Sequence, residues 1–573
     1  MSLFGSLQLA SNALQATQIG LQVVGNNIAN ANTPGFVRER ALFAPAPVQK
    51  LGTLTLGLGV EVLGIVQIID QFTESRLRDA GGDRASAEVQ EAAYRDLEVI
   101  LNPLGDENIS AKLANFFNTI ELVSQNPSEL ANRNLAISAG EELAQTINTT
   151  RRRVNVEHEN LNTRVSQLAT EINTLAEEIR QLNLRIVNIE GGGASGSDAG
   201  GLRSQRAVAL KRLAEIADLQ SNESETGVVN ISVNGEFLVF EGTRREVAAE
   251  NVSEDGTVNN RIFFVKSGSE LVVGGGELGG IYEARDTILG GFLTSFDEFA
   301  GALAFEFNKV FSQGQGREGF TSLTGTYRAD DLTASLDQAG LAFSPENGEF
   351  TVLIHNKTID GAGDIERHTI DVDLLGTNGD PTTLTSLAEQ LDAISGISAT
   401  VSLDNQLVIN SESPADIDFG FEKDSSGVLA ALGINTFFTG SDARSLRVNQ
   451  ELTVGIAAGA KFAASLSGFG EDVSNALQLS NLQHTVLSDL DGNTLVGIYS
   501  QLIDTTAQGA TTTASVAQGL RIFEGTLEAK AQAVTGVNLD EEAIDMIQLQ
   551  RAYQASARYI QTLSELLDVL VNI

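Results

Sequence analysis

The chain has 573 residues, of which 42% are apolar and 20% charged, so it is long enough for several domains and too apolar to be disordered. Its 37 lysines and arginines against 75 aspartates and glutamates give a net charge of −38, which argues against nucleic acid and anionic membranes as partners. Cysteine is absent, which excludes disulfides, thiolate metal sites and thiol nucleophiles, and suits a chain exported unfolded through a narrow channel.

The sequence has no run of 18 consecutive apolar residues, so no membrane-spanning helix is predicted. The N-terminus has no basic region, and Gln, Asn, Ser and Thr interrupt its apolar runs, so a cleavable signal peptide is not predicted either. If the protein leaves the cell, we expect it to use another route.

The N-terminal segment, from Met1 to Val37, contains no charged side chain. Apolar positions recur in it at intervals of four and three, which predicts one continuous helix with a heptad seam. The seam comprises Leu3, Leu7, Ala10, Leu14, Thr17, Leu21, Val24 and Ile28. A solvated helix normally carries charges on its other faces, so we expect this one to be surrounded by copies of itself; the alternative is an ordinary core helix.

This helix should end near Asn30–Ala31, because Pro34 disfavours the α conformation at the preceding residue and Gly35 supplies a turn. Phe36 would then anchor the turn through an apolar contact. The predicted assembly interface therefore includes the helix end and the turn, namely Asn30, Asn32, Thr33, Pro34, Gly35 and Phe36.

A second helical region is predicted from about Arg84 to Glu190. Its second half has an unbroken heptad seam made of Leu161, Val165, Leu168, Ile172, Leu175, Ile179, Leu182, Ile186 and Ile189. Such a helix must pack on another long helix, and residues 202–219 or 287–310 could supply it. The latter segment carries Leu289, Phe292, Phe296, Phe299 and Leu303 at helical spacing, which predicts core packing rather than a cofactor site.

The remaining middle of the chain alternates between loops, strands and helices. The glycine-rich run from Gly191 to Gly201 predicts a loop and lacks the Gly-Lys-Ser/Thr of a phosphate-binding loop. Residues 226–283 change to a period of two, with a type I′ turn predicted at Asn234-Gly235. Residues 314–459 are also β-rich, with predicted strands at Phe350–Ile354, Ala399–Leu403 and Leu407–Ile409, and a short helix at Leu387–Ile394. Helical patterning returns after Lys461.

The C-terminal segment mirrors the N-terminal one. Asn538 to Glu542 offers an N-cap followed by carboxylates where the helix dipole favours them. Apolar or small residues then repeat at intervals of three and four at Met546, Leu549, Tyr553, Ser556, Ile560, Leu563, Leu567 and Leu570. Two terminal heptad helices can pair antiparallel, but an isolated pair of this length is marginal in water, so we expect lateral neighbours to complete it.

These two ends carry a family resemblance. Val24-Gly-Asn-Asn-Ile-Ala-Asn-Ala-Asn-Thr-Pro-Gly-Phe36 resembles the N-terminal signature of bacterial flagellar rod, hook and hook-associated proteins, and residues 535–542 and 547–570 resemble the matching C-terminal signature. The resemblance implies an exported, extracellular structural protein at the junction of hook and filament. It also implies contacts with other copies of the chain, with hook protein and with hook-associated protein 3. Before export, it implies a cytoplasmic chaperone bound to the C-terminal helix.

The predicted fold is therefore an α+β multidomain chain. Residues 1–44 with 536–573 form a polymerising terminal helix pair, and residues 45–225 with 284–313 and 460–535 form a mainly helical domain with a coiled coil. Residues 226–283 form a small β domain, and residues 314–459 a β-rich outer domain that resembles, more loosely, those inserted in hook-associated proteins.

No catalytic, metal or cofactor site is predicted. His158, His355, His368 and His484 are not at ligand spacing, and Asp489–Asn493 departs from a calcium loop, with Ser500 where the twelfth-position glutamate belongs. Two alternatives stay open. One is a hook or distal rod protein, which usually lacks a coiled coil like that at 161–189. The other is an enzyme, such as a wall hydrolase, carried on an axial scaffold and detectable by cell-wall digestion in a gel.

Overall fold

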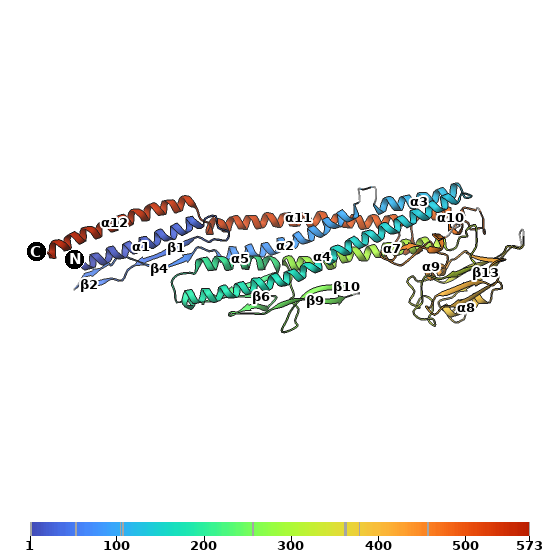
Figure 1. Ribbon diagram of the computed structural model, residues 1–573, viewed down its shortest axis with the longest axis horizontal. Coiled ribbons are helices and arrows are strands. Elements are labelled where there is room, and N and C mark those ends of the chain that lie inside the picture. The colour runs from blue at the N-terminus through green and yellow to red at the C-terminus, as the bar shows by residue number, and fades with distance from the viewer. Residues whose placement is uncertain are drawn as a thin grey trace. The chain divides into compact units, whose positions relative to one another are not determined.

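The computed structural model describes residues 3–51, 54–102, 105, 108–254, 257–359, 364–377, 379–454, 458–470 and 472–571. The chain divides into two compact units, the first made of Met1–Ala92, Glu159–Arg285 and Thr511–Ile573, the second of Ala93–His158 and Asp286–Ala510. Both units combine helices with small antiparallel sheets, which confirms the α+β class (Figure 1). Both ends of the chain belong to the first unit.

The terminal helices of the first unit are α1 (Leu3–Asn30) and α12 (Leu539–Val571), which lie side by side with the chain ends at the same tip (Figure 1). The predicted helix end at Asn30 is confirmed. A hairpin that the sequence did not predict packs against α1; it consists of β1 (Glu39–Pro45), β2 (Gln49–Leu51), β3 (Leu54–Leu56) and β4 (Val60–Gln67).

The predicted helical region 84–190 is three helices, α2 (Gln71–Leu101), α3 (Ile109–Gln125) and α4 (Leu130–Glu190). The first begins earlier than expected because the Asp70 carboxylate accepts hydrogen bonds from the backbone N–H groups of Phe72 and Thr73, both at 3.2 Å. The break before α4 contains Pro127, which disfavours helical geometry at the residue before it.

The core of the first unit forms around the predicted seam of α4. Residues Val165 to Ile179 on one side of this helix pack with α5 (Gly200–Ile216), as predicted, and with strands of the first unit. Ile189 is the exception, because its side chain is 62% exposed. The remaining elements are β5 (Leu219–Glu223), β6 (Val229–Val233), β7 (Glu236–Phe240), β8 (Thr243–Arg244), β9 (Val247–Glu254), β10 (Thr257–Phe264) and α6 (Gly276–Tyr282).

The predicted turn between β6 and β7 is confirmed. Asn234 and Gly235 have φ values of +47° and +83°, the two positive values that a type I′ turn requires. Local turn chemistry was therefore sufficient to place this hairpin.

The second unit packs helices and two three-stranded sheets. A cluster of phenylalanines, including Phe116, Phe307 and Phe437, joins α3 and α7 (Gly290–Phe311). Its other elements are β11 (Ser322–Thr324), β12 (Gly348–Asn356), β13 (Ile365–Val372), α8 (Leu384–Asp392), β14 (Ile397–Val401), β15 (Leu407–Ser411), β16 (Ile417–Glu422), α9 (Val428–Leu432), β17 (Phe438–Thr439), β18 (Arg447–Val448) and α10 (Ser474–Asn481). The helix α11 (Leu495–Thr535) begins in this unit and ends in the first.

Two sequence predictions in the second unit have definite outcomes. The strand expected to reach Leu403 ends at Val401, because Leu403 is in the turn and fully exposed. The aromatic stripe is a core feature, as predicted: Phe296 and Phe299 are 0% exposed.

The stretch Gly276–Phe311 is long and apolar enough to span a membrane, but half of its most apolar window is buried inside the protein, as in a core helix.

Candidate functional site

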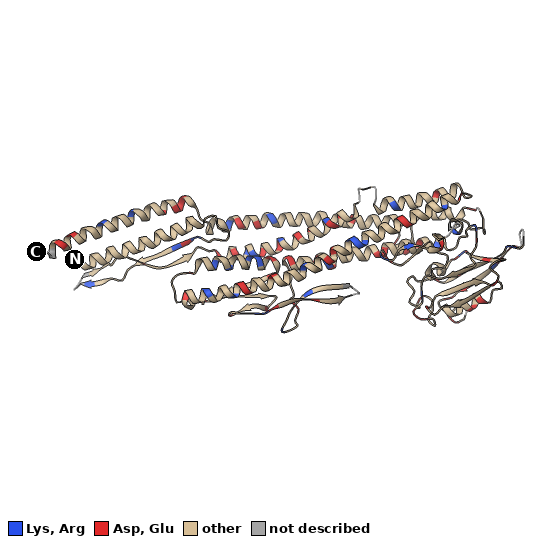
Figure 2. Cartoon of the chain, in the orientation of Figure 1, with Lys and Arg blue, Asp and Glu red and all other residues tan. Residues whose placement is uncertain are grey.

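The paired terminal helices are the candidate functional site. They run antiparallel, because Gly20 of α1 lies against Leu549 of α12 while Asn27 contacts Glu542. A Cβ atom on Gly20 would lie 3.1 Å from the Leu549 methyl groups, so the glycine allows the two helices to approach closely. Figure 2 shows that α1 carries no charged residue, whereas α12 carries both signs.

The predicted seam of α12 faces α1, since Leu549 lies against Gly20, but the predicted seam of α1 is not the side that faces α12 most directly. The buried residues of α1 are Ala10, Ala16, Gly20, Val23, Val24 and Asn27, of which only Ala10 and Val24 belong to the predicted seam. Leu563 is 5% exposed, and the other seam residues of α12 are half-buried, namely Met546, Leu549, Tyr553, Ser556, Ile560 and Leu567. On α1, Val24 is buried, and Leu7, Leu14, Leu21 and Ile28 are half-buried. The side chains of Leu3 and Leu570 lie outside the described residues. Within a single chain the seams therefore cover each other only in part.

A hydrogen-bond network joins the two signature motifs. We call it the clasp, and its members are Asn27, Arg38, Glu39, Glu541 and Glu542. The Asn27 amide accepts a hydrogen bond from the backbone N–H of Glu39 at 3.0 Å and donates to the carbonyl of Glu39 at 2.9 Å and to the Glu542 carboxylate at 3.1 Å. The Arg38 guanidinium donates to Glu542 at 2.7 Å and to Glu541 at 3.0 Å. Asn27 and Glu542 are each 1% exposed, so neither has water as an alternative partner.

Helix α12 begins as the sequence predicts. The Asn538 side chain accepts a hydrogen bond from the backbone N–H of Asp540 at 3.0 Å. Three carboxylates, those of Asp540, Glu541 and Glu542, follow in the first turn, where the helix dipole stabilises negative charge. One of these carboxylates also completes the clasp, so the start of α12 is held to β1.

The signature turn after α1 is tight and exposed. Thr33 donates its backbone N–H to Asn30 at 2.9 Å, and Phe36 donates to Thr33 at 3.1 Å. Gly35 has a φ of +74°, and a Cβ there would lie 2.3 Å from Val208 of α5, so only glycine fits. The residues Asn32, Thr33, Pro34 and Gly35 are exposed, while Asn30 and Phe36 are half-buried.

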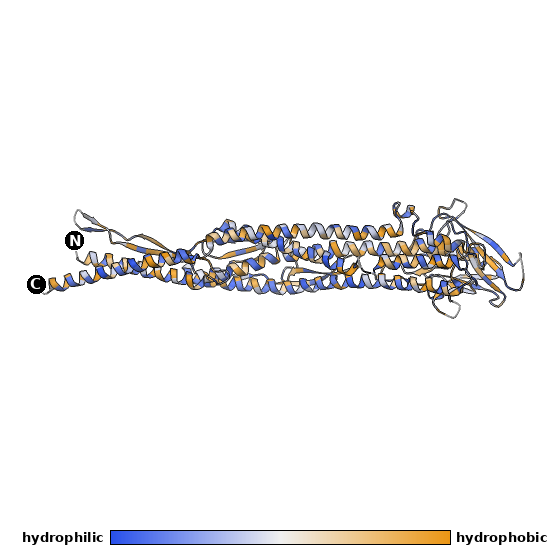
Figure 3. Cartoon of the chain, turned by 90° about the horizontal axis from the view of Figure 1, so that it is seen from above, coloured by the Kyte–Doolittle hydropathy of each residue, from blue (hydrophilic) through white to orange (hydrophobic). Residues whose placement is uncertain are grey.

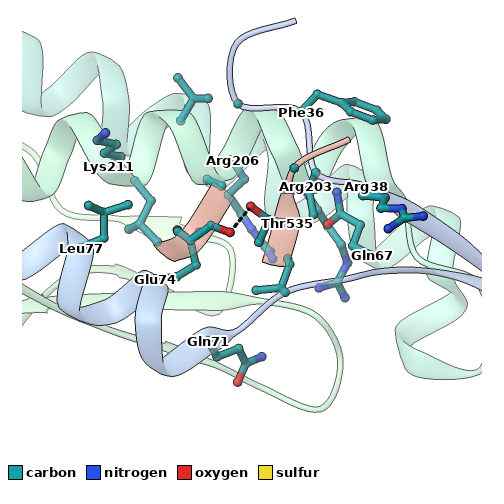
Figure 4. Close-up of a pocket in the computed structure, with 18 of the residues that line it drawn as sticks. Phe36, Arg38, Gln67, Gln71, Glu74, Leu77, Arg203, Arg206, Lys211 and Thr535 are labelled. Atoms are coloured by element: carbon teal, nitrogen blue, oxygen red, sulfur yellow. Dashed lines mark hydrogen bonds between the residues drawn. The ribbon is translucent and has the colours of Figure 1, made fainter. Parts of the chain in front are cut away.

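This turn borders a cavity of about 1420 Å³, which α2, α5 and the link between α11 and α12 also line (Figure 4). The arginines around it have partners: Arg203 bonds Glu190 at 2.7 Å and Glu223 at 2.7 Å, and the hydrogen bond to Glu190 raises the pKa of Arg203. Burial lowers the pKa of Arg206, which bonds Glu223 at 3.1 Å. Arg78 also lines the cavity and donates a hydrogen bond to the Ser221 hydroxyl at 3.4 Å.

A second apolar stripe, which the sequence analysis missed, lies on the other side of α12 from the seam. It comprises Ile544, Ile547, Tyr559, Leu566 and Val569, which are between 43% and 59% exposed. The positions share one side of the helix in two groups, 544–547 and 559–569, and the charged Arg551 and Arg558 between them hide the pattern from a search for hydrophobic periodicity. Figure 3 shows apolar residues along α12, interleaved with hydrophilic ones.

Among the residues that the structure describes, no group of three or more His, Asp or Glu side chains is placed to hold a metal ion. One close pair of this kind, His355 and Asp418 at 2.7 Å, joins two strands of the second unit. Asp489 bonds Lys309 of α7 at 2.6 Å, so its segment forms a structural contact with that helix.

Three models of flagellar protein families match separate parts of the chain. The Flagellar hook-associated protein FlgK helical domain matches residues 94–324, the Flagella basal body rod protein family matches residues 7–36, and the Flagellar basal body rod FlgEFG protein C-terminal family matches residues 530–573. The last two matches contain most of the terminal helix pair.

The relatives that match over nearly their whole length are flagellar hook-associated protein 1 of several bacteria. The chain is 25% identical to the Salmonella typhimurium protein over 98% of this chain and 99% of that one. It is 24% identical to the Escherichia coli protein and 23% identical to the Bacillus subtilis protein, each covered to 98%. Among solved structures, the flagellar hook junction protein FlgK from Burkholderia pseudomallei has a TM-score of 0.51 at 14% identity, with 80% of this chain and 100% of that chain covered.

Proposed function

Since the chain belongs to the family of flagellar hook-associated proteins, we propose that it is a structural subunit of the bacterial flagellum that joins hook to filament. It is an exported component of the flagellum, and we propose that its place is the hook–filament junction, reached without a cleavable signal peptide. The role is structural, and we propose no reaction for it.

One observation carries the assembly mechanism: the side of α12 away from the seam exposes large apolar side chains in two groups, at 544–547 and 559–569, with exposed Arg551 and Arg558 between them. Helix α1 packs on the seam, and the second stripe, which includes Ile547 and Leu566, is left about half exposed. Apolar side chains that recur along an uncovered helix face mark an interaction site. The second stripe is therefore the surface that neighbouring subunits cover when the subunit joins the flagellum.

The uncharged α1 supports the same proposal. Copies of a chain with a net charge of −38 repel one another, and a helix without charges can lie among copies of itself without adding to that repulsion. We therefore retain Leu3 to Phe36 and Met546 to Leu570 as the proposed assembly region, with the second stripe of α12 added to it.

The proposed partners follow from the family. We propose hook protein on one side of the junction, hook-associated protein 3 on the other, and a cytoplasmic export chaperone that covers the C-terminal helix before secretion. The exposed Ile544, Ile547 and Leu566 are the kind of apolar surface that such a chaperone would shield before assembly.

The test is a matched pair of substitutions on α12 in a strain that lacks the native protein. Ile547→Asp places a charge on the second stripe, whereas Gln550→Asp places the same charge at an exposed position outside both stripes. We expect both chains to fold and to be exported, and only the Gln550→Asp chain to join filaments to hooks. Electron micrographs of the Ile547→Asp strain should show hooks without filaments, with flagellin shed into the medium. Normal filaments in that strain would overturn the proposal.

A further inference from the structure

A second uncovered helix face lies on α11, in the part that belongs to the first unit. Exposed residues recur there at helical spacing, and we call this set the α11 face: Thr512, Ser515, Val516, Gly519, Ile522 and Phe523. Its three large apolar side chains, Val516, Ile522 and Phe523, are 51%, 61% and 43% exposed.

The α11 face is unusual in its charge. No charged residue occurs from Thr505 to Leu520, although one residue in five of the whole chain is charged. The carboxylate next to the face, that of Glu524, is paired with Arg84 at 2.5 Å. Likewise Arg521 is paired with Glu88 at 2.8 Å and with Glu91. The face therefore presents no unneutralised negative charge, in a protein whose net charge is −38.

An arginine of α2 stands at the end of this face. The Arg76 guanidinium lies 5.8 Å from the ring centroid of Phe72 and 5.8 Å from that of Phe523. Phe72 is 68% exposed, and in the described part of the chain no carboxylate lies within ion-pair distance of Arg76. Arginine and aromatic side chains in exposed contact are the composition of interface hot spots.

The α11 face also contains a glycine that the monomer does not require. A Cβ atom on Gly519 would meet no atom within 4 Å, and glycine in a helix interior is destabilising relative to alanine. A glycine at an open surface position lets another backbone approach the helix closely. Gly525 is equally open, but it points to a different side of α11, so it provides a matched control.

We propose that the α11 face, together with Phe72 and Arg76, is where a second copy of this chain packs against the first unit. Contact between copies of an acidic chain is least opposed by repulsion where carboxylates are absent or neutralised, and the α11 face meets that condition. Arg76 is available to pair with a carboxylate of the neighbouring copy. The inference rests on the proposed function, because it names the lateral partner within the junction.

Photo-crosslinking identifies the occupant directly. Since the chain has no cysteine, Ser515→Cys gives one attachment point for a benzophenone maleimide on the full-length protein. Irradiation of isolated hook–filament junctions should give a product of twice the 60.7 kDa chain mass. The same label on the Gly525→Cys chain should give at least tenfold less of it. A crosslink from the Ser515→Cys chain to a different flagellar protein, or equal yields from the two variants, would overturn the inference.

A pair of glycine substitutions tests the contact without a label. Gly519→Leu and Gly525→Leu both improve helix propensity, so both chains should melt at or above the wild-type temperature. Only Gly519→Leu should reduce the fraction of hooks that carry filaments, by at least tenfold. If Gly519→Leu joins filaments normally while Ile547→Asp does not, the lateral contact is wrong and the proposed function stands. If Gly519→Leu and Ile547→Asp both join filaments normally, the proposed assembly mechanism is wrong as well.

Discussion

Asn27 and Glu542 are 515 positions apart in the chain, yet the Asn27 side-chain amide donates a hydrogen bond of 3.1 Å to the Glu542 carboxylate. Each belongs to one of the two terminal signatures, and both are buried. The same amide also pairs with both backbone groups of Glu39, so one side chain holds α1, β1 and α12 together. The signatures therefore have a conformational role within one chain, beside any role in assembly.

Asn27→Ala should destabilise the first unit by about 1–3 kcal/mol, because the buried Glu542 carboxylate and the part-buried backbone groups of Glu39 lose a partner. Urea denaturation followed by circular dichroism measures the change. Asn26→Ala is the matched control. The exposed Asn26 side chain donates to the Glu39 carboxylate at 3.1 Å and accepts from the Asn30 amide at 2.9 Å, so only exposed contacts are lost and the stability should change by no more than about 0.5 kcal/mol. Equal effects of the two substitutions would show that the clasp does not stabilise the fold.

Glu542→Gln should loosen the start of α12. The substitution keeps the shape but removes the buried charge that Arg38 contacts at 2.7 Å, and a hydrogen bond to a charged group contributes about 1.5–3 kcal/mol. Glu541→Gln removes an exposed partner of the same arginine and should lower the free energy of unfolding by less than about 1 kcal/mol. Limited proteolysis should cleave the Glu542→Gln chain faster between α11 and α12. Faster cleavage of the Glu541→Gln chain would contradict this ranking.

Deleting residues 563–573 should leave the rest of the protein folded while stopping assembly. The deletion removes Leu563, which is buried against α1, and the exposed Leu566 and Val569 of the second stripe. Circular dichroism and thermal melting of the second unit should change little, because none of its described residues lies in the deleted segment. Normal hook–filament joining by the truncated chain would count against a role for this end of α12.

The stability of the first unit should depend on pH through Glu177. Hydrogen bonds from Arg180, Gln181 and Arg244 lower the pKa of Glu177 to about 2 from an ordinary value of 4.5. Because the folded state favours the ionised form, this contribution is complete above pH 4.5 and is lost as the pH falls toward 2. The difference in Tm between wild type and Glu177→Gln should therefore shrink over that range. A difference that stays constant from about pH 7 to about pH 2 would refute the assignment.

Much of the secondary structure followed from local signals. The heptad spacing located α1, the seam of α4 and α12, and proline and glycine located the end of α1 at Asn30. The hairpin of β1 to β4 did not follow, because its strands are short and it depends on α1 as a packing surface. The α+β class is confirmed, whereas the division into four domains and the assembly residues stay predictions.

The terminal seams show the limit of periodicity. Spacing identified Met546 to Leu567 as one apolar face, and the structure shows α1 packed on it. The same spacing cannot say whether the partner of a seam is in the same chain or in a neighbour. The exposed stripe with Ile547 became visible only when the place of α1 was known.

By itself, the sequence determined the period of the helices, the end of α1 and the start of α12, because these depend on side chains a few residues apart. Only the tertiary structure decided which polar residues hold the fold. Asn27, Asn173, Asn183 and Asn308 each lie on a helix and pair their amide with backbone N–H and C=O groups of a strand, at Glu39, Val247, Val229 and Phe438. In the sequence these asparagines resemble any solvated one, because their partners are brought beside them only by folding.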